Sequence, residues 1–168
     1  MKYAIAAAAV AALFAVSSPA SAEDNTYYGS VGYSGIDLDD ASLGAVAVRG
    51  AARFSDMNIG LEAEGQFGID DDTVSGVPVE LDHQYALYGV AYLPGGENTD
   101  LLIRIGYGRA SLTVGGADVS DDSWNWGVGA QHFFKGGNNG IRLDWTRYEI
   151  DGSDDSDAIT LSYVRRFR

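Results

Sequence analysis

The sequence contains no cysteine, and its 11 lysines and arginines are outnumbered by 24 aspartates and glutamates. Without cysteine, an exported form of the chain must be stable without disulfide bonds. The formal net charge of −13 argues against binding to nucleic acid, whose phosphates require Lys and Arg, and against simple adsorption to anionic lipid. Only 3 prolines occur, against 22 glycines, 10 tyrosines and 3 tryptophans, and this mixture is typical of a β-protein rich in glycine and aromatic residues.

The N-terminus has the features of a secretory signal peptide. An apolar run from Ala4 to Val16 follows Lys2. Pro19 ends this run, and Ala20-Ser21-Ala22 forms a small-residue cleavage site. The run is too short to span a bilayer, so we expect a signal peptide over residues 1–22 rather than a transmembrane or buried helix. After it, no stretch reaches about 18 consecutive apolar residues, so no transmembrane helix is expected.

The stretch from Asn58 to Ile69 alternates strictly between two kinds of residue. Its odd positions are apolar or small, as in Leu61 and Phe67, whereas its even positions include Glu62 and Glu64 among glycines. A period of two predicts a β-strand, and the length matches the roughly 9–11 residues with which a tilted strand crosses a bilayer. Glycines beside a few charges suit a cramped polar interior, so this stretch is predicted to be one transmembrane strand of a β-barrel.

Seven further stretches alternate in the same way, which gives eight predicted strands within one domain of residues 23–168. The predicted strands are Tyr27–Ile36, Gly44–Phe54, Asn58–Ile69, Asp82–Leu93, Asp100–Ala110, Ser123–Phe134, Ile141–Ile150 and Ile159–Phe167. The expected fold is therefore all-β: an eight-stranded antiparallel up-and-down transmembrane β-barrel.

The connections between these strands alternate in length. Residues 55–57, 94–99 and 135–139 are short and turn-like, whereas residues 37–43, 70–81, 111–122 and 151–158 are longer on the whole and rich in aspartate. Short turns at one end and longer loops at the other are typical of outer-membrane barrels, whose turns face the periplasm. We therefore expect the acidic loops to face outward. Residues 151–157 also suggest a calcium loop, but they lack the full spacing and the distal bidentate Glu of an EF-hand, so a solvated loop is preferred.

Several charged and amide residues fall on the inward register of the predicted strands. Isolated charges in such an interior would be costly, so pairing is expected. We predict a structural network in the lumen and no general diffusion pore, because eight strands leave an interior that side chains can fill. The predicted members are Arg49, Glu62, Glu64, Arg104, Gln131, Arg142, Asp144 and Arg166.

Three segments carry a family resemblance: Leu102–Arg109, Trp124–Gln131 and Gly140–Tyr148. With them, the chain from residue 23 onward resembles the small eight-stranded outer-membrane proteins of the OmpA/OmpX type. The resemblance implies location in the bacterial outer membrane, contact with its lipid and lipopolysaccharide, and a monomeric state. Near the C-terminus, Tyr163 and Phe167 resemble the signal that the barrel assembly machinery reads, although Arg168 follows the final aromatic residue.

Two alternative functions remain to be weighed against a structural or surface-interaction role. A soluble lipocalin-like carrier would turn its apolar face inward. A barrel enzyme that modifies lipid A would need a nucleophile motif, and neither His83 nor His132 has one; both fall on apolar registers near strand ends. Glu62 and Glu64 could form an acid/base pair, but inward arginines make an ion network the preferred interpretation. No enzymatic activity, cofactor, metal site or nucleic-acid partner is therefore expected.

Overall fold

The computed structural model describes residues 25–38, 41–54, 57–74, 76–135, 137–150 and 155–167. The predicted signal peptide, residues 1–22, lies outside the described residues, as does most of the acidic segment 151–157, which is expected to be a solvated loop. The strands are β1 (Thr26–Leu38), β2 (Ala41–Phe54), β3 (Ile59–Asp70), β4 (Asp72–Val74), β5 (Val77–Gly96), β6 (Thr99–Val114), β7 (Ala117–Phe133), β8 (Asn139–Ile150) and β9 (Ser156–Phe167). Within the described part of the chain, no helix is long and apolar enough to cross a membrane.

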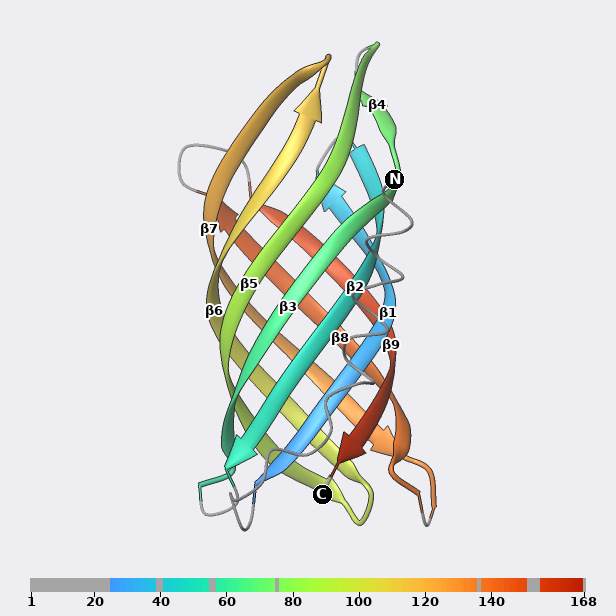
Figure 1. Ribbon diagram of the computed structural model, residues 1–168, viewed down its shortest axis with the longest axis vertical. Helices are drawn as coiled ribbons and strands as arrows, with labels where there is room; N and C mark the ends of the chain where they lie inside the picture. The colour runs from blue at the N-terminus through green and yellow to red at the C-terminus, as the bar shows by residue number, and fades with distance from the viewer. Residues whose placement is uncertain are drawn as a thin grey trace.

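Eight of the strands form a closed antiparallel barrel (Figure 1). Their order is β3-β2-β1-β9-β8-β7-β6-β5, and a further pairing of β3 with β5 closes the sheet. Apart from the closing pair β1 and β9, these neighbours follow one another along the chain, with the short β4 inserted between β3 and β5. The predicted eight-stranded up-and-down barrel is confirmed, with β4 as an addition.

Two of the predicted loops are much shorter in the structure than the sequence predicts. Most of residues 70–81 and 111–122 form strands, because β5 already begins at Val77, and β6 and β7 meet only at Val114 and Ala117. Gly115 and Gly116 connect β6 to β7 with φ values of 58° and 88°. Two consecutive residues with positive φ make the two-residue hairpin turn that best matches strand twist. The strands therefore extend beyond the rest of the barrel at this end, as Figure 1 shows for β5, β6 and β7.

The faces of the barrel follow the predicted alternation. Along β3, Glu62, Glu64 and Gln66 are buried, whereas Leu61 is 52% exposed. The same pattern leaves apolar side chains on the outer surface of most strands. Exposed members include Ile103, Ile105, Val128, Leu143, Ile159 and Leu161. Such a large apolar surface marks a membrane interaction site, and it excludes a lipocalin-like carrier, whose apolar face would point inward.

The sequence predicts a polar lumen, but the lumen of the structure is polar only in part. Two apolar clusters lie inside the barrel, one toward each end of the strands. The cluster on the turn side contains Tyr28, Ala86, Tyr88, Val90, Tyr92, Leu102, Phe133 and Val164. The cluster on the loop side contains Ile36, Leu43, Ala45, Leu81, Tyr148 and Ala158. Polar and charged side chains therefore occupy the middle of the lumen, between two apolar zones.

Aromatic side chains on the outer surface pair across neighbouring strands. Tyr107 and Trp124 meet edge to face with ring centroids 5.5 Å apart, and Trp126 and Trp145 do so at 5.1 Å. The Trp126 indole also donates a hydrogen bond to Glu149 Oε1 at 2.9 Å. Amphipathic rings of this kind are enriched at membrane interfaces, where one edge is apolar and the other is wet.

Asp72 holds the short strand β4 against β2. Its carboxylate accepts hydrogen bonds from the backbone N–H groups of Ser42, at 2.9 Å, and Thr73, at 2.7 Å. These two bonds, that from Ser42 first, lower the pKa of Asp72 below its ordinary value. The ionised side chain thus fastens the hairpin of β4 and β5 to the rim of the barrel.

Candidate functional site: a buried charge cluster across the lumen

Six charged side chains meet in the middle of the lumen, and we call them the charge cluster. Alternate residues of a strand share one face, so Glu62 and Glu64 of β3 both point inward. One partner, Arg49, lies on the neighbouring strand β2, and the other two arginines come from β6 and β8. The members are Arg49, Glu62, Glu64, Arg104, Arg142 and Asp144, and each is at most 4% exposed. Three cations and three anions make the cluster formally neutral.

Glu62 joins two arginines from different strands. Its Oε1 accepts hydrogen bonds from Arg104 Nη1 at 2.7 Å and from Arg142 Nη2 at 3.1 Å. Its Oε2 accepts a further bond from Arg142 Nη1. Fork-like contacts of this kind between guanidinium and carboxylate are among the stronger hydrogen bonds in proteins. Glu62 therefore connects β3 to β6 and β8 through the interior of the barrel.

Glu64 and Asp144 complete the cluster on either side of Arg49. Glu64 accepts hydrogen bonds from Arg49 Nε and, at 3.1 Å, from Arg104 Nη1. Asp144 accepts from Arg49 Nη1 at 3.1 Å and from Arg142 Nε at 2.9 Å. Each carboxylate thus contacts two arginines, and each arginine contacts two carboxylates. All three carboxylates are therefore held in ion pairs within the lumen.

Polar and aromatic neighbours hold the arginines in place. Arg104 donates to Thr146 Oγ1 at 2.7 Å, and its guanidinium carbon lies 4.3 Å from the centre of the Tyr88 ring. Arg49 donates to Ser162 Oγ at 3.1 Å. Cation–π contacts are strongest where the cation is desolvated. Together with the carboxylates, these contacts restrict the arginines to one arrangement across the lumen.

Two residues predicted for the network lie outside the charge cluster. Gln131 donates instead to Asp100 Oδ2 at 3.0 Å, and Asp100 also pairs with Arg53 at 3.2 Å. Arg166 lies over the Phe133 ring, with its guanidinium carbon 4.4 Å from the ring centre. Both predictions are therefore corrected. Arg166 lies nearer the turns than the cluster does, whereas Gln131 lies opposite Arg142 but donates its hydrogen bond to Asp100.

The two histidines lie on the outward register, as expected. His132 Nδ1 is 2.9 Å from Thr99 Oγ1, and the His83 ring is 5.1 Å from that of Tyr85. Among the described residues, no three His, Cys, Asp or Glu side chains gather in a way that could hold a metal ion. In the described part of the acidic segment after β8, Asp155 and Asp157 pair with Arg147 at 3.0 and 3.4 Å.

The residues of the predicted assembly signal lie at the turn-side end of β9. Tyr163 points outward, and its hydroxyl donates to Asn139 Oδ1 at 2.7 Å. Phe167 pairs with Tyr27 of β1, and the Arg165 guanidinium lies 5.6 Å from the Phe167 ring centre. The final strand thus closes against the first at this end of the barrel.

Gly129 makes room for Asp144 of the charge cluster rather than for one of the arginines. A Cβ added at Gly129 would lie 2.5 Å from Asp144 Oδ1 and 2.8 Å from the Leu143 carbonyl oxygen. We expect Gly129→Ala to displace Asp144 and to lower the free energy of unfolding by about 1–3 kcal/mol, as overpacking does. Denaturant unfolding of the protein in lipid, followed by tryptophan fluorescence, measures this loss.

Gly89→Ala is the matched control for Gly129→Ala. The closest atom to a Cβ at Gly89 is the Ile105 carbonyl oxygen at 3.9 Å, an ordinary contact. Gly89 should therefore tolerate alanine with little change in stability. Equal losses in the two variants would show that the backbone freedom of glycine, rather than space beside Asp144, decides the effect.

The closed barrel, its outward apolar surface and its filled lumen define a small transmembrane β-barrel. The family model of the outer membrane protein beta-barrel domain matches residues 6–167, and the chain belongs to this family. This membership places the protein in the bacterial outer membrane. A search of curated proteins finds no significant match to the sequence.

Three solved structures illustrate the shared fold. The chain is 15% identical to Ail, the attachment invasion locus protein of Yersinia pestis, with a TM-score of 0.64 over 86% of this chain and 99% of that one. The N-terminal barrel of Pseudomonas aeruginosa OprF is 10% identical to the chain, with a TM-score of 0.60 over 83% of this chain and 97% of that one. Neisserial surface protein A is 14% identical, with a TM-score of 0.57 over 84% of this chain and 95% of that one. At such low identities, these likenesses show the fold alone.

Proposed function

We propose that the protein is a structural or surface-interaction barrel of the outer membrane whose lumen is closed to general diffusion. The charge cluster carries this proposal, because six buried, mutually bonded side chains from β2, β3, β6 and β8 span the interior. Apolar side chains fill the lumen on the turn side of the cluster. Barrels with aqueous channels have about 16–18 strands, whereas eight strands leave only room for side chains.

Recording from the purified protein in a planar lipid bilayer tests the closed lumen. The wild-type protein should show no stable, large openings at moderate voltage, because the arginines and carboxylates leave no continuous water path. A sixteen-stranded porin prepared in the same detergent provides the positive control. Regular large openings from the wild-type barrel would contradict the proposal.

The proposed orientation turns the loop-side end toward the exterior. The described residues of the loop-side end include twelve carboxylates and only two arginines. This count covers residues 35–38, 41–44, 68–74, 76–84, 108–124, 147–150 and 155–158. The acids are Asp37, Asp70, Asp71, Asp72, Glu80, Asp82, Asp118, Asp121, Asp122, Glu149, Asp155 and Asp157, and the bases are Arg109 and Arg147. Ail has been solved with a heparin analogue, sucrose octasulfate. An acidic exterior would repel such a polysulfate, so we do not transfer that ligand to this chain.

An epitope inserted after Gly76 tests this orientation. Gly76 lies in the turn between β4 and β5, and its φ of 85° and open surroundings make the site tolerant of insertion. Antibody should label intact cells that carry this insertion. An epitope in the turn between β5 and β6, after Glu97, should be labelled only after the outer membrane is disrupted. The reverse result would invert the orientation.

Outer-membrane lipid and lipopolysaccharide are the proposed surroundings of the outward apolar face. The barrel assembly machinery is the proposed partner during biogenesis, with Tyr163 and Phe167 as its signal, and a monomer is the proposed state. We further propose that the protein is not an enzyme. Glu62 and Glu64 are each held by two arginines, and the histidines lie on the outward register, away from these carboxylates.

A further inference from the structure

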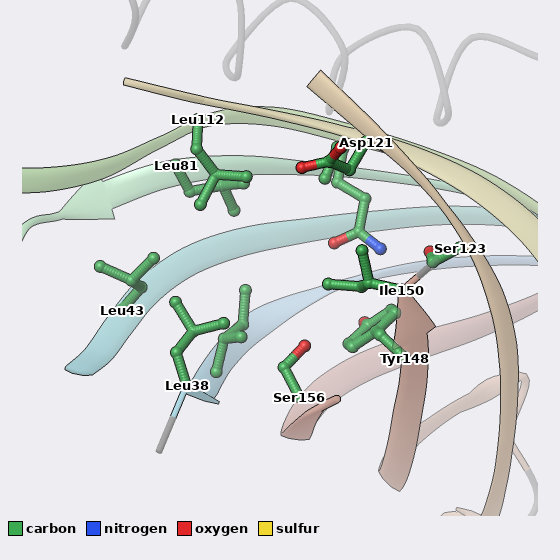
Figure 2. A pocket seen from close by; sticks show the side chains of 12 residues that line it. Leu38, Leu43, Leu81, Leu112, Asp121, Ser123, Tyr148, Ile150 and Ser156 are labelled. Carbon is green, nitrogen blue, oxygen red and sulfur yellow. The ribbon is translucent and has the colours of Figure 1, made fainter. Parts of the chain in front are cut away.

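The loop-side end of the lumen holds a cavity of about 50 Å³, which we call the apolar mouth (Figure 2). Seven strands contribute to its lining, so it lies at the opening of the barrel rather than on its wall. Its apolar lining consists mainly of Ile36, Leu38, Leu43, Leu81, Leu112 and Ile150. An opening lined by leucine and isoleucine is unexpected at the most acidic end of the protein, where water would be the natural occupant of a polar lumen.

Several polar groups in the floor of the apolar mouth already have hydrogen-bond partners. The Tyr148 hydroxyl accepts a hydrogen bond from Gln66 Nε2 at 2.8 Å, and the same amide nitrogen donates to Glu64 of the charge cluster at 2.9 Å. Ser123 donates to Asn125 Oδ1 at 2.7 Å. A molecule that enters from the loop side therefore meets mainly apolar walls, although Gln84, Ser123 and Ser156 also contribute to the lining. In the floor, Gln66 Oε1 is buried without a hydrogen-bond partner.

One carboxylate lines the apolar mouth itself. Asp121 lies on β7 opposite Ala110 of β6, and both residues contribute to the lining. The next residue, Asp122, lies on the outward register, where it faces Arg109 at 3.8 Å and is 47% exposed at its side chain. The cavity thus combines an apolar interior with a negative group, within an end of the protein whose charge is strongly negative.

We propose that the apolar mouth binds a small aliphatic monoamine in its protonated form. The alkyl tail fills the cavity between the leucines, and the ammonium group lies at Asp121. A volume of about 50 Å³ is well above the roughly 10–15 Å³ that one water needs and far below the roughly 150 Å³ of a cavity that holds benzene, so it accepts only a short tail. The acidic rim disfavours carboxylates, and the apolar interior disfavours a second charge on the tail.

Methyl NMR of the protein in zwitterionic phospholipid nanodiscs tests this site with n-butylammonium as the probe. Titration should give saturable shifts confined to the methyl groups of Leu43, Leu81 and Leu112, with a dissociation constant on the order of millimolar for so small a buried tail. Butanoate and butane-1,4-diammonium are the two comparison ligands, and both should bind much more weakly. Equal shifts with butanoate, or the absence of saturable shifts with butylammonium, would overturn the proposal.

Neutralising two adjacent acids separates the site from the general surface charge. Asp121→Asn should weaken butylammonium binding about fivefold, as expected for a partly exposed ion pair. Asp122→Asn removes the same charge from the outer face and should leave the affinity unchanged. Equal weakening by both variants would show that only the acidic surface attracts the amine.

Filling the cavity provides a second, independent variant. Ala110→Leu should abolish the butylammonium shifts, because the larger side chain occupies the space of the tail. Folding of this variant is checked by its heat-modifiable gel mobility. Unchanged binding to the folded variant would show that the amine binds somewhere other than the apolar mouth.

Discussion

Glu62→Gln is expected to lower the free energy of unfolding by about 3–5 kcal/mol, the cost of breaking a buried ion pair by removal of one partner. The side chain of Glu62 is fully buried and bonds both Arg104 and Arg142. Glutamine retains the shape but not the charge, so three arginines would face two carboxylates in the middle of the lumen. The loss should be measured by reversible denaturant unfolding in lipid, with tryptophan fluorescence as the signal.

Glu149→Gln is the matched control, because it makes the same chemical change on the outer face. Glu149 is exposed and accepts one hydrogen bond, from the Trp126 indole. Exposed charges contribute about 0–1 kcal/mol, so this variant should unfold nearly as the wild type does. If Glu62→Gln were as mild as Glu149→Gln, water would have to reach the cluster, and the closed lumen would be wrong.

The strand alternation was sufficient to predict the barrel and the inward residues of β3. It was not sufficient to predict where the strands end on the loop side. Residues 117–122 contain three aspartates, which are depleted in strands, so they were interpreted as a loop. The two glycines at 115 and 116 outweigh this preference, because they form a tight hairpin that pairs Leu112 with Val119. Two consecutive glycines between alternating residues were a signal for this hairpin.

The charge cluster could be predicted only in part. The strands of a barrel are staggered, so the position of a residue along its own strand does not give its height in the lumen relative to residues of other strands. Ser162 is the residue of β9 that lies opposite Arg142, so Arg166 falls four residues nearer the turns and cannot reach the cluster. Gln131 does lie opposite Arg142, but it also lies opposite Asp100, which takes its hydrogen bond. Register between strands decides the position of Arg166, and competition from Asp100 decides the partner of Gln131. A single sequence contains neither of these.

The apolar mouth was missed for a related reason. Leu43, Leu81 and Leu112 were assigned to connections, where the direction of a side chain has no period. Once the strands extend to these positions, the same alternation turns Leu43 and Leu112 inward. Leu81 also points inward, but only because the register shifts between Leu81 and His83. Longer strands therefore change the character of the opening from polar to apolar.

Replacing Glu62 and Arg142 together should be less damaging than the sum of the two single replacements. Each single variant leaves an excess buried charge, whereas Glu62→Gln with Arg142→Gln removes one charge of each sign. The four remaining members still contact one another, since Arg49 bonds Glu64 and Asp144 and Arg104 bonds Glu64. We expect a coupling energy of about 2–3 kcal/mol, near the upper end for contacting residues.

The double variant also separates stability from closure of the lumen. The shorter, neutral glutamine at position 142 leaves space beside Asp144 that water can occupy, so the folded variant should show small, discrete openings in a planar bilayer where the wild type shows none. Gln131→Ala with Asn139→Ala is the control, because it changes two uncharged residues outside the cluster. A coupling energy near zero would mean that Glu62 and Arg142 act independently. A stable double variant that remains closed would assign the closure to the apolar zones on either side, and the charge cluster would then serve only to hold the strands together.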